Sequence, residues 1–167
     1  MMLKSNNTIQ IGVVGVGYLG RRHLEHTMQL KDAECCGFFD KDAERSALIA
    51  QESGATSHNS LAALLESANI ITIVVPTVDH FSVAQVCINA GKHVFIEKPM
   101  CETVEEADTL LELAEKKGVQ IHVGHIERLN PALVALNGIE LAPRYIETHR
   151  LAPYTVRGTD VPVVLDL

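Results

Sequence analysis

The feature that most constrains this chain is an apolar segment from Thr8 that ends in a glycine-rich turn. The turn reads Gly15-Val16-Gly17-Tyr18-Leu19-Gly20, which is the spacing G-x-G-x-x-G. A polar, helix-competent run follows at once, so the predicted order is strand, tight turn and helix. In such a turn the first glycine allows the bend, the second lets the backbone approach a pyrophosphate, and the third lets the helix pack on the strand.

The helix that begins in this turn has unpaired amides at its N-terminus, and these favour phosphate groups. The sequence therefore predicts a dinucleotide site in which Tyr18 and Leu19 take part beside the three glycines. The alternative is a glycine-rich turn that binds no ligand.

A second strand is expected over Ala33–Phe39, and it is followed by Asp40. An acid about 20 residues beyond such a turn can hold the hydroxyls of an adenosine ribose. A carboxylate also repels a 2′-phosphate, so NAD is favoured over NADP, although Lys41 and Arg45 lie nearby and could weaken that preference. The alternative role for Asp40 is to cap the next helix, which Asp42 could do instead.

Strand-like and helix-like segments alternate along the rest of the chain. Helices are expected over about 18–30, 42–53, 61–66, 77–90 and 104–117, and strands over about 55–57, 69–75, 93–97 and 119–124. The run Asn69–Val75 is almost entirely β-branched, which is typical of a central parallel strand. With right-handed crossovers, the alternation predicts an α/β fold, a Rossmann doubly wound parallel sheet.

Two domains are expected, because the alternation ends near residue 137. Residues 1–137 are predicted to form an NAD(P)-binding Rossmann domain, and residues 138–167 to begin a second, α+β domain that is cut off. The segment Val161–Leu167 starts an apolar run within which the chain stops, so we expect a longer polypeptide.

Composition excludes several classes of protein. The formal charge of −7 and the pI of about 5.6 argue against nucleic acid as a partner, because no basic stripe is present. No apolar run approaches the ~18 residues of a membrane span, and Met1–Gln10 does not resemble a secretory signal. A cytoplasmic location is therefore expected. The spacing of the cysteines and histidines does not match a metal site, so no metal is expected. The four cysteines are predicted to be buried free thiols: Cys35, Cys36, Cys87 and Cys101.

The end of the expected central strand carries Pro76-Thr77-Val78-Asp79-His80. Open α/β sheets bind ligands at the carboxyl ends of their strands, so Pro76, Thr77 and His80 are predicted to contact the cofactor. For His80, a capping or surface role is equally consistent with the spacing.

The next strand ends in Glu97-Lys98-Pro99. Together with the glycine turn and Pro76-Thr77-x-x-His80, this motif resembles the glucose–fructose oxidoreductase/inositol dehydrogenase (Gfo/Idh/MocA) family. The resemblance covers about the first half of such a protein. It implies hydride transfer between NAD or NADP and a hydroxyl-bearing carbon of a sugar or cyclitol. It also implies a second domain that covers the substrate and often builds a homo-oligomer.

By this resemblance Lys98 would reach the nicotinamide ribose and the substrate hydroxyl, held in place by Glu97 and Pro99. A partly buried lysine is suited to accept or polarise a hydroxyl proton. The alternatives are an ion pair with Glu97 or a solvated side chain. Asp166 matches the first position of the family's Asp-x-x-x-His motif, whose histidine would lie beyond Leu167.

The stretches Gly124–Ala132 and His149–Pro153 resemble a branch of this family that oxidises UDP-N-acetylglucosamine at the sugar 3-position. Guanidinium groups suit a diphosphate, although surface charges are an equally good interpretation. A non-catalytic dinucleotide-binding or sensing module is the alternative function for the whole chain. The residues predicted to contact a sugar-nucleotide substrate are Arg128, Asn130, Arg150 and Arg157.

Overall fold

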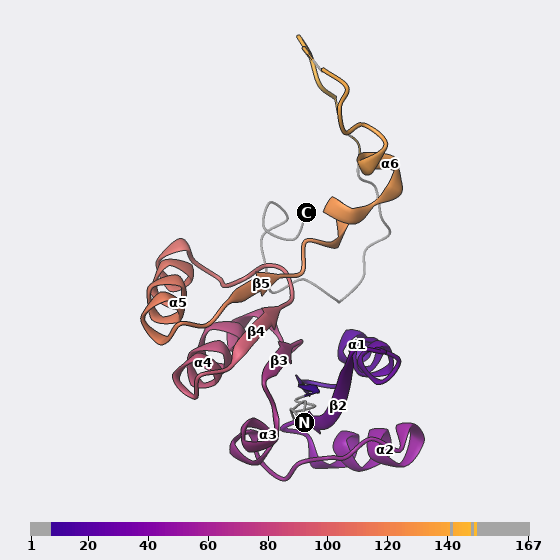
Figure 1. Cartoon of the computed structure of the whole chain (residues 1–167), viewed down its shortest axis with the longest axis vertical. Coiled ribbons are helices and arrows are strands. Elements are labelled where there is room, and N and C mark those ends of the chain that lie inside the picture. The colour runs from indigo at the N-terminus through magenta and orange to yellow at the C-terminus, as the bar shows by residue number, and fades with distance from the viewer. Residues whose placement is uncertain (1–7, 141, 148, 150–167) are drawn as a thin grey trace, which may run out of the picture. The chain divides into compact units, whose positions relative to one another are not determined.

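Figure 1 shows the protein as a computed structural model that describes residues 8–140, 142–147 and 149. The chain divides into two compact units, Met1–Gly124 and His125–Leu167, and each is described by itself. The predicted domain boundary at residues 137 and 138 stays a prediction.

The first unit is built on a five-stranded sheet in which every neighbouring pair of strands is parallel. The order across the sheet is β2-β1-β3-β4-β5, so the direction of strand addition reverses at β1. This confirms the predicted doubly wound α/β fold, and it puts the switch point between the carboxyl ends of β1 and β3. The strands are β1 (Ile9–Val14), β2 (Ala33–Phe39), β3 (Ile70–Ile73), β4 (His93–Ile96) and β5 (Ile121–Val123).

The strand expected over 55–57 is reduced to one parallel bridge between Phe38 and Ser57. This bridge extends the sheet beyond β2 at a single position. The segment is too short for a ladder, since the chain turns into the next helix within a few residues.

The helices lie between the strands, as the alternation predicts. Polar side chains cap three of them: Asp42 accepts from the Arg45 amide, Ser60 from the Ala63 amide, and Thr103 from the Glu106 amide. None of the helices in the described ranges is both long and apolar enough to cross a membrane. The helices of this unit are α1 (Tyr18–Met28), α2 (Ala43–Ser53), α3 (Leu61–Ser67), α4 (Thr77–Asn89) and α5 (Val104–Lys117).

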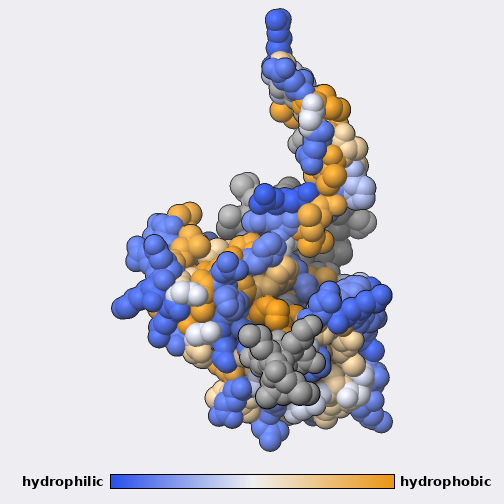
Figure 2. Space-filling view, viewed as in Figure 1, coloured by the Kyte–Doolittle hydropathy of each residue, from blue (hydrophilic) through white to orange (hydrophobic). Residues whose placement is uncertain are grey.

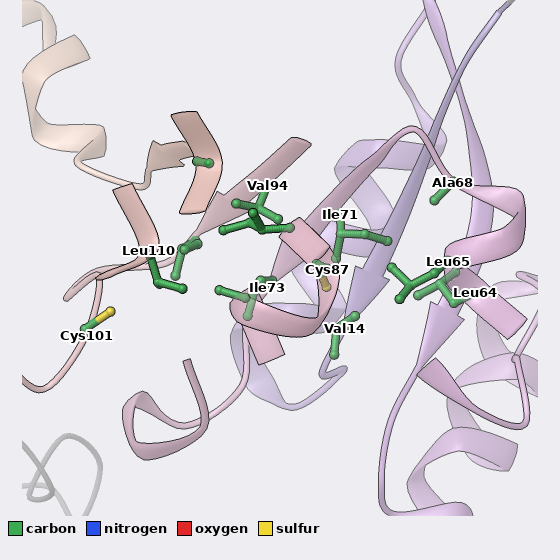
Figure 3. Packing of buried hydrophobic residues seen from close by; sticks show 14 residues of the cluster. Val14, Leu64, Leu65, Ala68, Ile71, Ile73, Cys87, Val94, Cys101 and Leu110 are labelled. Carbon is green, nitrogen blue, oxygen red and sulfur yellow. The ribbon is translucent and has the colours of Figure 1, made fainter. Parts of the chain in front are cut away.

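Two hydrophobic clusters fill the two faces of the sheet. Val13 and Phe38 point toward α1 and α2, where they pack with Leu24 and Ile49. The neighbouring Val14 points to the opposite face, because successive side chains of a strand alternate. There the larger cluster joins β1, β3 and β4 to α3, α4 and α5 (Figure 3). Both faces of the central strands are therefore buried.

The four cysteines are free thiols in this packing. Cys87 and Cys101 are buried, whereas Cys35 and Cys36 are only half-buried. Burial raises the pKa of Cys87 to about 12 and the pKa values of Cys36 and Cys101 to about 11. The protonated, unreactive form is thus favoured at neutral pH. In the part of the chain that the structure describes, no group of three His, Cys, Asp or Glu side chains could hold a metal ion.

The second unit contains two short helical segments among its described residues. The 3₁₀ helix η1 (Ile126–Leu129) is followed by α6 (Pro131–Val134). Pro131 at the first position of α6 suits a helix start, because its missing amide would have no partner there.

We expect Gly20→Ala to lower the free energy of unfolding by at least about 2 kcal/mol, because its new methyl group overpacks a backbone contact. A Cβ at Gly20 would lie 1.8 Å from the Gly15 carbonyl oxygen, which no side-chain movement can relieve. Urea denaturation measures the change. Gly17→Ala is the matched control, since a Cβ there meets nothing within 4 Å; it should cost less than about 1 kcal/mol. Equal costs for the two variants would contradict the packing described.

Candidate functional site

The turn after β1 bends in a conformation that requires glycine at its first position. Gly15 has φ +85°, in the left-handed region, and its amide donates to the Phe39 carbonyl oxygen at 2.9 Å. A Cβ on Gly15 would lie 2.7 Å from the Val74 carbonyl oxygen. The bend therefore brings the ends of β1, β2 and β3 together.

The second glycine leaves room beside the helix start. Gly17 is the N-cap of α1, and space is open where its side chain would be. No side chain caps α1, and its first turn contains no acidic residue. Tyr18 is exposed, with the Arg22 guanidinium 5.5 Å from its ring centroid, and Leu19 is half-buried. The α1 amides thus face a space that an anionic group can enter.

Asp40 lies at the end of β2, and its side chain is only 4% exposed. Its carboxylate accepts from the Val16 amide at 2.8 Å and from the Asp42 amide at 2.9 Å. The Arg45 guanidinium lies 3.2 and 3.3 Å from its two oxygens. Asp42, not Asp40, is the N-cap of α2. Asp40 therefore holds the glycine turn to β2, and its predicted contact with a ribose stays a prediction.

An open hollow of about 420 Å³ adjoins this turn. The surface around α1 is largely hydrophilic (Figure 2). Two of the three arginines of the hollow form ion pairs: Arg21 with Glu25 and Glu52, and Arg45 with Asp40 and Asp42. The lining residues are Val16, Gly17, Tyr18, Arg21, Arg22, Glu25, Arg45 and Ile49.

The segment after β3 forms the start of α4. Pro76 is exposed as the N-cap of α4, and Thr77 is buried as its first residue. His80 is 1% exposed, and its ring nitrogens lie 2.8 Å from the Pro99 carbonyl oxygen and 3.0 Å from the Val75 carbonyl oxygen. His80 thus links the end of β3 to the segment after β4. The ring is enclosed by protein. Its predicted contact with the cofactor stays a prediction.

Glu97 begins the segment after β4, and its side chain is 13% exposed. One carboxylate oxygen lies 2.9 Å from His23 Nε2 on α1, and the other accepts from the Lys98 amide at 3.1 Å. Burial acts to raise the pKa of Glu97, but the hydrogen bonds with His23 and the Lys98 amide outweigh it, so its pKa is lowered. The positive charge of Lys98 acts in the same direction. Lys98 itself is half-buried, and its peptide bond to Pro99 is cis.

The structure therefore gathers the predicted residues of the first unit at the carboxyl edge of the sheet. The glycine turn contacts Asp40, His80 contacts Pro99, and α1 contacts Glu97.

The predicted substrate residues have different positions. Arg128 and Asn130 belong to the second unit. Asn130 accepts from the Ala132 amide as the N-cap of α6 and donates to Glu127. Arg150, Arg157 and Asp166 lie outside the described residues, and their roles stay predictions.

The contact between His23 and Glu97 was not expected from the sequence, since 74 positions separate the two residues. Arg45, which the sequence places near Asp40, contacts the carboxylate that was predicted to hold a ribose. The only sequence signal of a site role for His23 was its position in α1, about one helical turn after Gly20. A contact between residues so far apart in sequence depends on how the crossovers place α1 beside the end of β4.

The fold and the turn define a Rossmann dinucleotide-binding domain. A family model described as "Oxidoreductase family, NAD-binding Rossmann fold" (GFO_IDH_MocA) matches residues 9–125. The chain belongs to this Gfo/Idh/MocA family of oxidoreductases, as its motifs indicate.

Among its relatives is the UDP-N-acetylglucosamine 3-dehydrogenase of Acidithiobacillus ferrooxidans, which is 41% identical over 95% of this chain and 50% of the relative. A solved structure of that enzyme, GnnA, matches with a TM-score of 0.87 over 95% of this chain and 52% of the other. The chain thus spans about half the length of this relative.

Two more distant structures hold nicotinamide cofactors. GenD2 from gentamicin A biosynthesis, in complex with NAD, is 25% identical with a TM-score of 0.72 over 76% of this chain and 37% of the other. Biliverdin reductase from Synechocystis sp. PCC 6803, with biliverdin and NADP⁺, is 28% identical with a TM-score of 0.70 over 77% and 42%. The structural relatives therefore include both NAD and NADP complexes.

We expect Glu97→Gln to remove a pH-dependent part of the stability. Because the pKa of Glu97 is lowered in the folded state, its stabilisation is present above the unfolded value of 4.5 and is lost as pH falls through the folded value. The variant should be less stable by about 1–2 kcal/mol at pH 7, and the difference should shrink as pH falls below 4.5 through the lower folded pKa. Urea denaturation across pH measures it, with the exposed Glu112→Gln as control. A difference that persists at low pH would contradict this assignment.

Proposed function

We propose that this chain is the cofactor-binding half of an NAD-dependent dehydrogenase that acts on a hydroxyl-bearing carbon of a sugar nucleotide. The observation that carries the proposal is the joint placement of the glycine turn and Lys98 at one edge of the sheet. Family membership supports the same chemistry, since the family is one of NAD-binding oxidoreductases.

In this proposal the diphosphate lies against Gly17 and the first amides of α1, those of Tyr18 and Leu19. The open space at Gly17 and the uncapped helix start support it. Gly15 and Gly20 contribute through the shape of the turn rather than by contact. Pro76, which is exposed, would border the cofactor after β3, and Thr77 would support it from within.

NAD is proposed as the preferred cofactor because Asp40 stands where a ribose is expected, and its carboxylate would repel a 2′-phosphate. Arg45 partly neutralises that carboxylate, and Arg21 and Arg22 line the same hollow. NADP is therefore expected to bind too, but more weakly.

Lys98 is the proposed catalytic residue, and bound NAD would supply the acceptor for the substrate hydride. Removing a hydride from a carbinol carbon requires that the hydroxyl proton be accepted or polarised. The lysine nitrogen would hold that proton, while Glu97 and Pro99 fix the lysine backbone through His23 and His80. Asp166 would complete the site together with residues of a substrate domain.

UDP-N-acetylglucosamine is the proposed substrate, and the named relative with 41% identity supports it. Arg128, Asn130, Arg150 and Arg157 would contact this sugar nucleotide, the arginines through its diphosphate. A homo-oligomer remains a prediction of the resemblance, and a cytoplasmic location remains a prediction of the sequence composition.

We expect Gly17→Val to weaken NAD binding by more than about tenfold, because a side chain would occupy the space proposed for the diphosphate. The fold should survive, since that space is empty of protein atoms. Isothermal titration calorimetry of the chain with NAD and NADP measures the affinities, and circular dichroism checks the fold. Unchanged NAD affinity in a folded variant would remove the glycine turn from the site, and tighter binding of NADP than NAD would overturn the cofactor preference.

The product of the complete gene should reduce NAD in the presence of UDP-N-acetylglucosamine. The absorbance of NADH measures this reaction. Lys98→Ala should lower kcat by at least about 100-fold while the Kd for NAD changes by less than about threefold, because the lysine acts on the proton. The wild type without sugar nucleotide is the control. Cofactor binding without turnover on any sugar nucleotide would instead favour the non-catalytic binding module.

A further inference from the structure

The segment that carries Lys98 is held by two histidines from different helices. His80 of α4 contacts the Pro99 carbonyl oxygen, and His23 of α1 contacts the Glu97 carboxylate. The second contact is of particular interest because α1 is the helix that begins at the glycine turn.

The direction of the His23 hydrogen bond follows from the chemistry of its partner. The lowered pKa of Glu97 makes it a carboxylate at neutral pH, and a carboxylate only accepts. His23 Nε2 therefore carries a hydrogen and donates across 2.9 Å. The two side chains are 26% and 13% exposed, so water competes less for this bond than for a surface pair.

Glu97 has little freedom to leave this position. Its second oxygen accepts from the Lys98 amide, and a Cβ on Gly124 would lie only 3.0 Å from Glu97 Oε1. Glycine at 124, directly after β5, therefore leaves room for the carboxylate. Glu97 thus joins α1 on one side to the backbone of Lys98 on the other.

The His23 ring is itself fixed by neighbours on the sheet. Its centroid lies 5.6 Å from that of Phe95 on β4, and the Phe95 ring stacks on His122 of β5 at 5.5 Å. On α1, the His23 carbonyl oxygen accepts from the Thr27 hydroxyl at 2.7 Å. A ring held in this way can act as a spacer of constant length.

We propose that His23 is a positioning residue for Lys98: through Glu97 it ties α1 to the segment that carries the lysine. This inference rests on the proposed role of Lys98. One end of α1 faces the proposed diphosphate site, and its second turn sets the position of the lysine backbone. The distance between the diphosphate and the lysine is then set by one rigid helix.

The test compares three variants of the whole chain. His23→Leu removes the donor and keeps an apolar side chain of similar reach, and His23→Gln restores an amide donor near the position of Nε2. His26→Leu is the matched control, because His26 is an exposed histidine on the same helix. The measured quantity is the acylation rate of the Lys98 amino group by an amine-reactive ester, read by mass spectrometry with and without NAD.

In His23→Leu we expect the acylation of Lys98 to slow by at least about threefold, because the carboxylate released from His23 turns toward the lysine ammonium. Protection of Lys98 by NAD should also decrease. His23→Gln and His26→Leu should stay within about twofold of the wild type. In the product of the complete gene, His23→Leu should lower kcat far more than it raises the Kd for NAD, a split that mere loss of stability does not produce.

An acylation rate in folded His23→Leu equal to that of the wild type overturns the inference, as does a failure of His23→Gln to restore the rate. If His23→Leu does not fold, His23→Asn takes its place, because its shorter amide falls short of the Glu97 carboxylate; it should show the same slowing, and a wild-type rate in it overturns the inference. Failure of the wild-type chain to bind NAD would instead reject the proposed function, while the acylation rates without NAD would still test the His23 contact.

Discussion

The close packing of α1 on the turn that precedes it is the constraint on which the site depends. Gly20 lies so near the Gly15 carbonyl that only a hydrogen fits between the helix and the turn. This contact sets the direction in which α1 leaves β1. Because α1 is rigid, the same contact also decides where its amides and the His23 ring lie. A shift of the helix start would move both partners of the proposed site at once.

At the carboxyl edge of the sheet, buried or half-buried polar contacts link the segments that follow neighbouring strands. Asp40 joins the turn to β2, His80 joins β3 to the segment after β4, and Glu97 joins that segment to α1. Such bonds are costly to leave unmade once they are shielded from water, so they specify one arrangement of the strand ends. The site is thus preorganised by the protein, and a dinucleotide would meet a formed surface rather than order one.

The predictions from local pattern agree with the structure where the physics is local. The glycine spacing, the β-branched run at Asn69–Val75 and the helix cap at Asp42 depend on residues a few positions apart, so the local sequence is sufficient to predict them. The start of α5 shows the same local physics: the Glu106 amide donates to the Thr103 hydroxyl, and the Glu106 carboxylate accepts from the Glu102 amide.

The sequence by itself determined the doubly wound fold, the glycine turn and the family. The reason is that the alternation of strands and helices and the Glu-Lys-Pro motif depend on residues close together in the chain. Only the tertiary structure decided that His80 is enclosed between two carbonyls and that His23 donates to Glu97. These contacts join residues on different elements. Their physical basis is the packing of helices across the sheet, which no spacing along the chain encodes.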